Sequence, residues 1–148
     1  MSYQERRAIV SLFGSTLTFL LYCAYMLTRY PEVDAYSAEM FHFWGSFFLI
    51  LIPVSIIAKV IIQIIFVIIN AIITREDDPE IMDERDKLIE LKAMRNALYA
   101  FTFGFLVAMA SLVFDMTPPV MFAIFVCSGF LAGAVSDISE FYFYRRGV

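Results

Sequence analysis

Polar side chains inside long apolar stretches are the residues of this chain best suited to chemistry. Lys59 is the single charge between residues 40 and 73, and on a helical wheel Ser55, Gln63 and Asn70 share an arc of about 80° with it. A charged side chain at the centre of a bilayer costs about 2.5–3.5 kcal/mol on insertion scales. We therefore expect this polar stripe to face protein and not lipid, as a candidate ion-pair site.

Two carboxylates on the last apolar stretch are the natural counterparts of Lys59. Asp137 and Glu140 lie four and seven residues after Gly133, which forms a G-x-x-x-G pair with Gly129. Such a pair is typical of close helix contacts in membranes, so it predicts packing that turns both carboxylates inward. Lys59 and Asp137 each lie about 28 Å from the outer start of their stretch, which predicts that they pair.

Three interpretations of these polar residues remain open. Structural pairing is favoured, and an ion or proton relay at the cytoplasmic mouth comes second, because paired acidic and basic groups can exchange protons or admit an ion. The third is that Lys59 simply snorkels to the interface. Arg6, Arg7 and Arg95 are other candidate partners of the carboxylates. No carboxylate lies at the predicted midplane, which argues against a complete pathway.

The chain has no motif for catalysis, a cofactor or a metal. A P-loop, a G-x-S-x-G turn, a Ser/His/Asp set and a dinucleotide fingerprint are all missing, so we expect no enzyme and no cofactor. His42 is the only histidine, and Cys23 and Cys127 are the only cysteines. Without metal-ligand spacing, the cysteines are expected to be reduced apolar fillers and His42 an interfacial side chain.

The composition is that of a membrane protein. Of 148 residues, 61% are hydrophobic and 17% aromatic, and the mean hydropathy is +0.75. A helix of about 20 apolar residues crosses a bilayer, and the sequence predicts four spans, at about 8–28, 45–70, 96–114 and 118–138. The expected fold is all-α, a four-helix transmembrane bundle in a single integral membrane domain. A net charge of -4 speaks against nucleic acid as a partner.

The second apolar stretch is longer than one perpendicular crossing requires. Residues 40–73 would form a helix of about 51 Å, against a bilayer core of about 30 Å. Tilting and a kink at Pro53 are two ways to absorb the excess. We favour the other two, an interfacial start and a projection into the cytoplasm.

Positive charges predict the orientation of the spans. Arg29 is the single basic residue of the predicted outer loops, and nine lie at the other ends of the spans, which puts both termini in the cytoplasm. The nine are Arg6, Arg7, Arg75, Arg85, Lys87, Lys92, Arg95, Arg145 and Arg146. Tyr30, Tyr36 and Trp44 are expected at the outer interface.

A charged segment at residues 75–95 separates the second and third spans. Asp78 as N-cap and Pro79 at the first helical position predict a cytoplasmic helix over 79–95 that runs unbroken into the third span. A solvated helix is the favoured interpretation of its charges, a docking surface comes next, and a cation-binding cluster is third. Its apolar edge still requires a partner. The candidate docking residues are Asp83, Glu84, Arg85, Asp86, Leu88 and Leu91.

The stretch from Met82 to Asn96 carries a resemblance. Its acidic start Asp83-Glu84-Arg85-Asp86, followed by Ile89-Glu90 and Lys92, resembles the juxtamembrane motif of an uncharacterised bacterial and archaeal family of small four-span membrane proteins. The resemblance implies the plasma (inner) membrane of a prokaryote. Some members are paired with small DNA-binding regulators, which implies a regulatory role.

These observations lead to two expected functions. The first is a non-enzymatic membrane protein that associates with a partner protein or with further copies of itself through its acidic cytoplasmic helix. The alternative is a small oligomeric transporter or channel for an ion or small molecule, using Lys59 with Asp137 and Glu140.

Overall fold

The computed structural model describes residues 3–74 and 83–147, and its regular structure is entirely α-helical. Four helices follow one another: α1 (Tyr3–Leu27), α2 (Ala38–Thr74), α3 (Glu84–Val113) and α4 (Pro118–Arg146). Each contains a stretch long and apolar enough to cross a membrane. The predicted all-α class and the four candidate spans are therefore confirmed.

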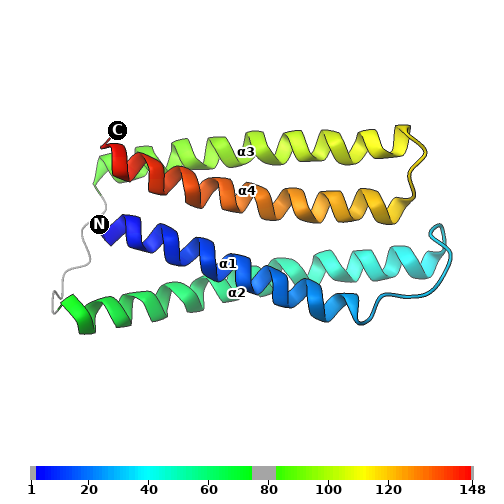
Figure 1. The fold of residues 1–148 in the computed structure, drawn as a ribbon, viewed down its shortest axis with the longest axis horizontal. Coiled ribbons are helices and arrows are strands. Elements are labelled where there is room, and N and C mark those ends of the chain that lie inside the picture. Colours follow the sequence, from blue (N-terminus) through cyan, green and yellow to red (C-terminus); the bar gives the residue numbers. More distant parts are fainter. Residues whose placement is uncertain (1–2, 75–82, 148) are drawn as a thin grey trace.

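The excess length of the second apolar stretch stays helical. α2 has 37 residues with Pro53 inside it, which corresponds to about 55 Å of helix. It extends beyond both limits of the predicted span 45–70, and in Figure 1 it reaches past both ends of α1. Residues 71–74 include no charged residue and no glycine, so the sequence has no signal that would end the helix at residue 70.

α3 begins later than the sequence predicted. Asp83 has extended backbone angles and caps the helix: its carboxylate accepts the Glu84 N–H at 2.7 Å, and Asp86 accepts the Asp83 N–H at 3.3 Å. This capping box contradicts a helix that passes unbroken from Pro79 through Asp83, because an N-cap residue is not helical. The predicted start at Asp78 and Pro79 lies outside the described residues.

The four helices form two antiparallel hairpins that lie side by side (Figure 1). Both chain termini are at one end, called here the terminal end, and the α1–α2 and α3–α4 connections are at the other, the loop end. α4 packs along α3 and against α1, and α1 packs against α2. Within the described ranges no Cα atom of α2 comes within 8 Å of one of α3. The helices therefore form an arc in the order α3, α4, α1 and α2, in which α2 approaches α4 over a short stretch.

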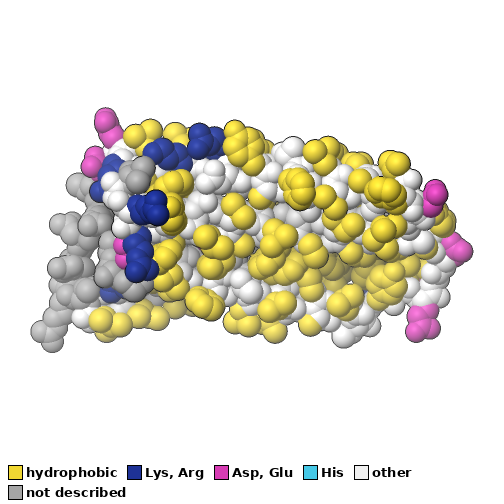
Figure 2. Space-filling view, turned by 45° about the horizontal axis from the view of Figure 1, so that its top comes forward, with side chains coloured by type: hydrophobic (Ala, Val, Ile, Leu, Met, Phe, Trp, Pro, Cys, Tyr) yellow, Lys and Arg dark blue, Asp and Glu magenta, His cyan; other side chains and the backbone are white. Residues whose placement is uncertain are grey.

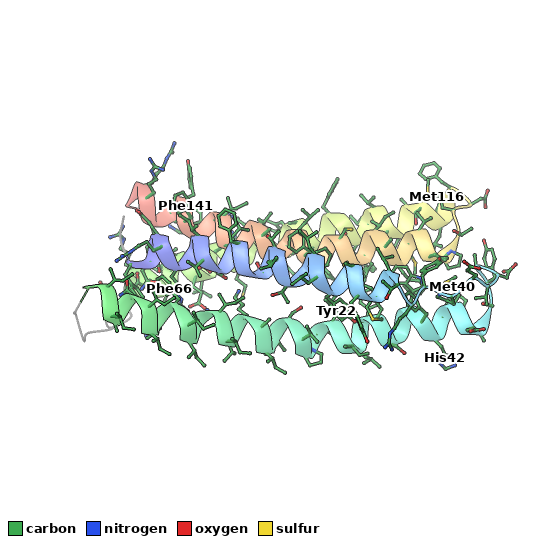
Figure 3. The ribbon with its side chains drawn as sticks, turned by 60° about the horizontal axis from the view of Figure 1, so that its bottom comes forward. Tyr22, Met40, His42, Phe66, Met116 and Phe141 are labelled. Atoms are coloured by element: carbon green, nitrogen blue, oxygen red, sulfur yellow. The ribbon has the colours of Figure 1, made fainter. Side chains whose placement is uncertain are left out.

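An aromatic core closes this arc toward the loop end. The Tyr22 hydroxyl donates to the Phe47 carbonyl at 2.7 Å, and Trp44 stacks on Phe122 with ring centroids 5.6 Å apart. Phe125 touches aromatic rings of both α2 and α3. The buried members of the core are Tyr22, Met26, Met40, Trp44, Phe47 and Val126. Figure 3 shows Tyr22 and Met40 in this half of the molecule.

Trp44 differs from its predicted place. It is 7% exposed, inside the aromatic core, and so it does not face the lipid interface. Tyr30 and Tyr36, by contrast, are 40% and 66% exposed. An indole buries a large apolar area, and contacts with neighbouring rings favour burial where three helices converge.

Charge is distributed unequally along the long axis. Figure 2 shows Lys and Arg gathered at the terminal end, and acidic side chains at both ends of the visible face. An uncharged apolar surface separates the two ends on that face. This is the surface expected of a protein that crosses a bilayer along its long axis.

Candidate functional site

An ion pair links the second and fourth helices. Lys59 Nζ lies 3.7 Å from Asp137 Oδ1, and the Ser11 hydroxyl of α1 donates to the same oxygen at 3.1 Å. The Asp137 side chain is 4% exposed, while that of Lys59 is 51% exposed. Three helices therefore hold one buried carboxylate, and the lysine side chain remains accessible from outside the protein.

The remaining polar candidates lie closer to the terminal end than this pair. Gln63 is half-buried further along α2, and Asn70 lines a second groove of about 560 Å³ between α1 and α2, together with Arg6. Glu140 is half-buried about one turn beyond Asp137 and interacts electrostatically with Asp137 and Lys59, and less strongly with Arg7 and Glu90. Lys59 is therefore the member of the predicted stripe that pairs with Asp137.

The glycine pair of α4 does not make the helix contact that its spacing predicted. A Cβ atom added at Gly129 or Gly133 would meet nothing within 4 Å, so the predicted tight packing at these glycines is wrong. α4 instead packs on α3 through Ser128 and Ala132, which are 5% and 9% exposed and lie one position earlier. One residue turns the helix by about 100°, and this directs both glycines to another face.

The close helix contacts occur at two other glycines. A Cβ atom at Gly104 would overlap Ser128 of α4, and one at Gly14 would lie 2.5 Å from the Ile62 side chain of α2. Gly104 belongs to a row of small residues spaced by three or four along α3, which the sequence analysis missed: Ala93, Ala97, Ala100, Gly104, Ala108 and Ser111. This spacing is the signal that could have revealed the α3–α4 contact.

A groove of about 490 Å³ opens between α2 and α4, with α1 as its floor. Gly129 and Gly133 form part of one wall, and Lys59 and Asp137 lie at its end nearest the chain termini. Phe48 and Phe125 line the opposite end. Most of the lining is apolar, so the ion pair is the charged feature of this groove. Its size is within the range of about 300–1,000 Å³ typical of ligand pockets.

The charged start of α3 packs against α4. Ile89 and Ala93 are fully buried, and Lys92 Nζ lies 5.8 Å from the centre of the Phe143 ring. The Asn96 amide donates to the Ser139 hydroxyl at 3.1 Å, and Tyr144 interacts electrostatically with Asp86. Much of the motif from Asp83 to Asn96 therefore has a structural role.

Other members of the predicted docking set are exposed. Asp83, Glu84 and Arg85 are exposed, and Leu88 and Leu91 of α3 are 57% and 62% exposed. Asp86 is half-buried and belongs to the capping box. The exposed candidates thus form a surface of two leucines bordered by charges.

Cysteine and histidine form no cluster with other ligands. In the described ranges no three His, Cys, Asp or Glu side chains are close enough to hold a metal ion. Cys23 and Cys127 are free thiols. Figure 3 shows His42 pointing away from the other helices, and its side chain is exposed.

Comparisons of the chain with protein-family models, with curated proteins and with solved structures found no match.

Proposed function

We propose that this chain is a multi-pass protein of a prokaryotic plasma membrane that acts without catalysis, by association with a partner protein. Both termini lie in the cytoplasm in this proposal, because Lys and Arg gather at the terminal end. The resemblance of the Asp83–Lys92 motif to a family of small four-span membrane proteins supports the same location and a regulatory role.

The observation that carries the proposal is the apolar surface at the end of α2. Counted from Pro118 at the loop end, Asp137 is about 28 Å deep, near the far limit of a bilayer core of about 30 Å. α2 continues about 22 Å beyond Lys59, the partner of Asp137, without another charged residue. Ile72 and Ile73 there are 72% and 71% exposed.

Exposed isoleucines at this depth favour a protein partner. Lipid chains cover such side chains within the core, but headgroups and water lie beyond it, where burying apolar area stabilises an association. Leu88 and Leu91 of α3 are exposed at the same end of the molecule. The partner-binding surface of this proposal comprises both patches, with Glu84 and Arg85 as charged neighbours.

Photo-crosslinking in native membranes tests this surface. A photoreactive residue at Ile72, Leu88 or Leu91 is expected to form adducts with one discrete protein, because these side chains lie beyond the proposed lipid core. The matched control is Ile52, which is 58% exposed in the middle of α2 and should react with lipid. Adducts are identified by mass spectrometry.

Two results would count against association. Lipid adducts alone at all four positions would place both patches in the bilayer, and random protein adducts would show no specific partner. Charge reversal at Glu84 is a suitable second test, since Asp83 and Asp86 cap α3 and their reversal would disturb the helix start. Adducts with a second copy of the chain would make the association homo-oligomeric.

The ion pair favours a second candidate function, transport of an ion or small molecule. Lys59 and Asp137 lie at one end of a groove that contains no other charged side chain. In proteoliposomes, Asp137→Asn should abolish ion-dependent flux, because a neutral amide cannot take up and release a proton or cation. Flux of equal rate in the wild type and this variant would exclude the pair as a transport site.

A further inference from the structure

The groove between α2 and α4 has the length of one membrane leaflet. Its α4 wall runs from Phe125 to Asp137, which corresponds to about 18 Å of helix. Half of a bilayer core is about 15 Å thick. The groove therefore extends from the depth of the headgroups at the terminal end to about the bilayer midplane, where the Phe48 and Phe125 rings close it.

The groove has room for one extended hydrocarbon chain. Such a chain has a cross-section of about 16 Å², because carbon atoms in contact lie about 4 Å apart. A chain about 18 Å long therefore occupies about 290 Å³. This is less than the groove volume of about 490 Å³, so one chain fits along the groove from Phe125 to Asp137.

Three of the four serine and threonine hydroxyl groups that line the groove are bonded within the protein; Ser55 is the fourth. Ser15 donates to the Leu12 carbonyl at 3.1 Å and Thr18 donates to the Gly14 carbonyl at 2.9 Å. Ser11 donates to Asp137. Gly129 leaves open space where a side chain would otherwise lie. An unfilled apolar space forfeits dispersion contacts, so a chain that fills it is stabilised there.

A positive charge is accessible at the headgroup end. The Asp137 carboxylate is 4% exposed and is covered by Ser11 and Lys59, whereas the Lys59 side chain is 51% exposed. Glu140 is half-buried and interacts electrostatically with Asp137 and Lys59, and less strongly with Arg7 and Glu90. The ammonium of Lys59 is therefore the charged group of the groove that an incoming headgroup meets first.

We propose that the groove binds one acyl chain of a phospholipid from the leaflet at the terminal end, with the lipid phosphate against the Lys59 ammonium. The Lys59–Asp137 pair then marks the headgroup depth, and the open positions at Gly129 and Gly133 accommodate the chain. The site does not depend on a partner protein, so its test is independent of the association proposed above.

Photoreactive lipids test the site on the full chain in nanodiscs. The probe is a phosphatidylglycerol with a diazirine near the end of one acyl chain, present at a few per cent in phosphatidylcholine. Adducts mapped by mass spectrometry should concentrate on Phe125 and Phe130 in the groove, relative to the exposed lipid-facing Leu49. Filling the groove with Gly129→Leu and Gly133→Leu together should lower the groove adducts about tenfold.

Gly45→Leu is the matched control, because a Cβ atom at Gly45 also meets nothing within 4 Å but Gly45 does not line the groove. It should leave groove labelling unchanged. A diacylglycerol probe with the same diazirine chain and no phosphate should label the groove several-fold less than phosphatidylglycerol. Uniform labelling of all exposed faces, or an equal loss in Gly45→Leu, would overturn the site. Equal labelling by the two probes would overturn the role of Lys59.

Discussion

Replacement of Lys59 by methionine should lower the free energy of unfolding by about 2–3 kcal/mol, because it leaves the Asp137 carboxylate buried without its counter-charge. Asp137→Asn should cost about 1 kcal/mol or less, because the amide still accepts the Ser11 hydroxyl and the half-exposed lysine can extend toward water. The two expected losses of stability differ because the Asp137 side chain is buried and the Lys59 side chain is half-exposed. Reversible unfolding in mixed micelles measures both values.

A double-mutant cycle separates the pair from its surroundings. Lys59→Met combined with Asp137→Asn should be close in stability to Asp137→Asn alone, since no carboxylate then remains unpaired. Lys59→Arg is the conservative control and should retain most of the stability. Equal losses in Lys59→Met and Asp137→Asn would contradict the asymmetry, and additive losses would show that the two side chains do not interact.

A methyl group at Gly104 should be the most damaging small change in the α3–α4 contact. In Gly104→Ala the new Cβ would overlap the Ser128 side chain and lie 3.3 Å from the Ser128 Cα, so the helices must separate. Overpacking of this kind costs about 1–3 kcal/mol, and we expect the upper part of that range because backbone cannot move aside locally. Unfolding in mixed micelles measures the loss.

Gly129→Ala is the matched control on the facing helix. It adds the same methyl group where nothing lies within 4 Å, so stability should stay equal or rise by up to about 1 kcal/mol from helix propensity. Ser128→Gly should recover part of the loss in Gly104→Ala by removing the overlapping atoms. If Gly129→Ala destabilised the protein more than Gly104→Ala, the G-x-x-x-G pair would be the helix contact after all.

The α3 helix start shows how local signals can compete. Asp78-Pro79 and Asp83 with Asp86 both have the residue types of an N-terminal cap. The structure has a capping box at Asp83, and the same Asp86 also interacts electrostatically with Tyr144 of α4. This contact between α3 and α4 therefore favours the helix start at Asp83. A prediction from local residue preferences alone does not include such a contact.

Gly129 and Gly133 of α4 show a similar limit of prediction from local sequence. Their spacing was visible in the sequence, but so was the row of small residues on α3 that includes Gly104. Lipid chains and protein interiors are almost equally apolar, so hydropathy does not show which face of a membrane helix meets another helix. The small residues at Gly104 and Ser128 allow close approach there, and Gly129 is left beside the groove.

The helical class, the four candidate spans and the unequal charge of the two ends could be predicted from the sequence, because these follow from apolar length and charge counted along the chain. The sequence also placed Lys59 and Asp137 at one depth, since a constant rise per residue sets depth. Other features depend on the packing of the helices: the hydrogen bond from Ser11 to Asp137, the burial of Trp44, the glycines in contact, and the groove between α2 and α4. Each of these depends on how helices are rotated against one another, and that rotation is set by packing between residues distant in sequence.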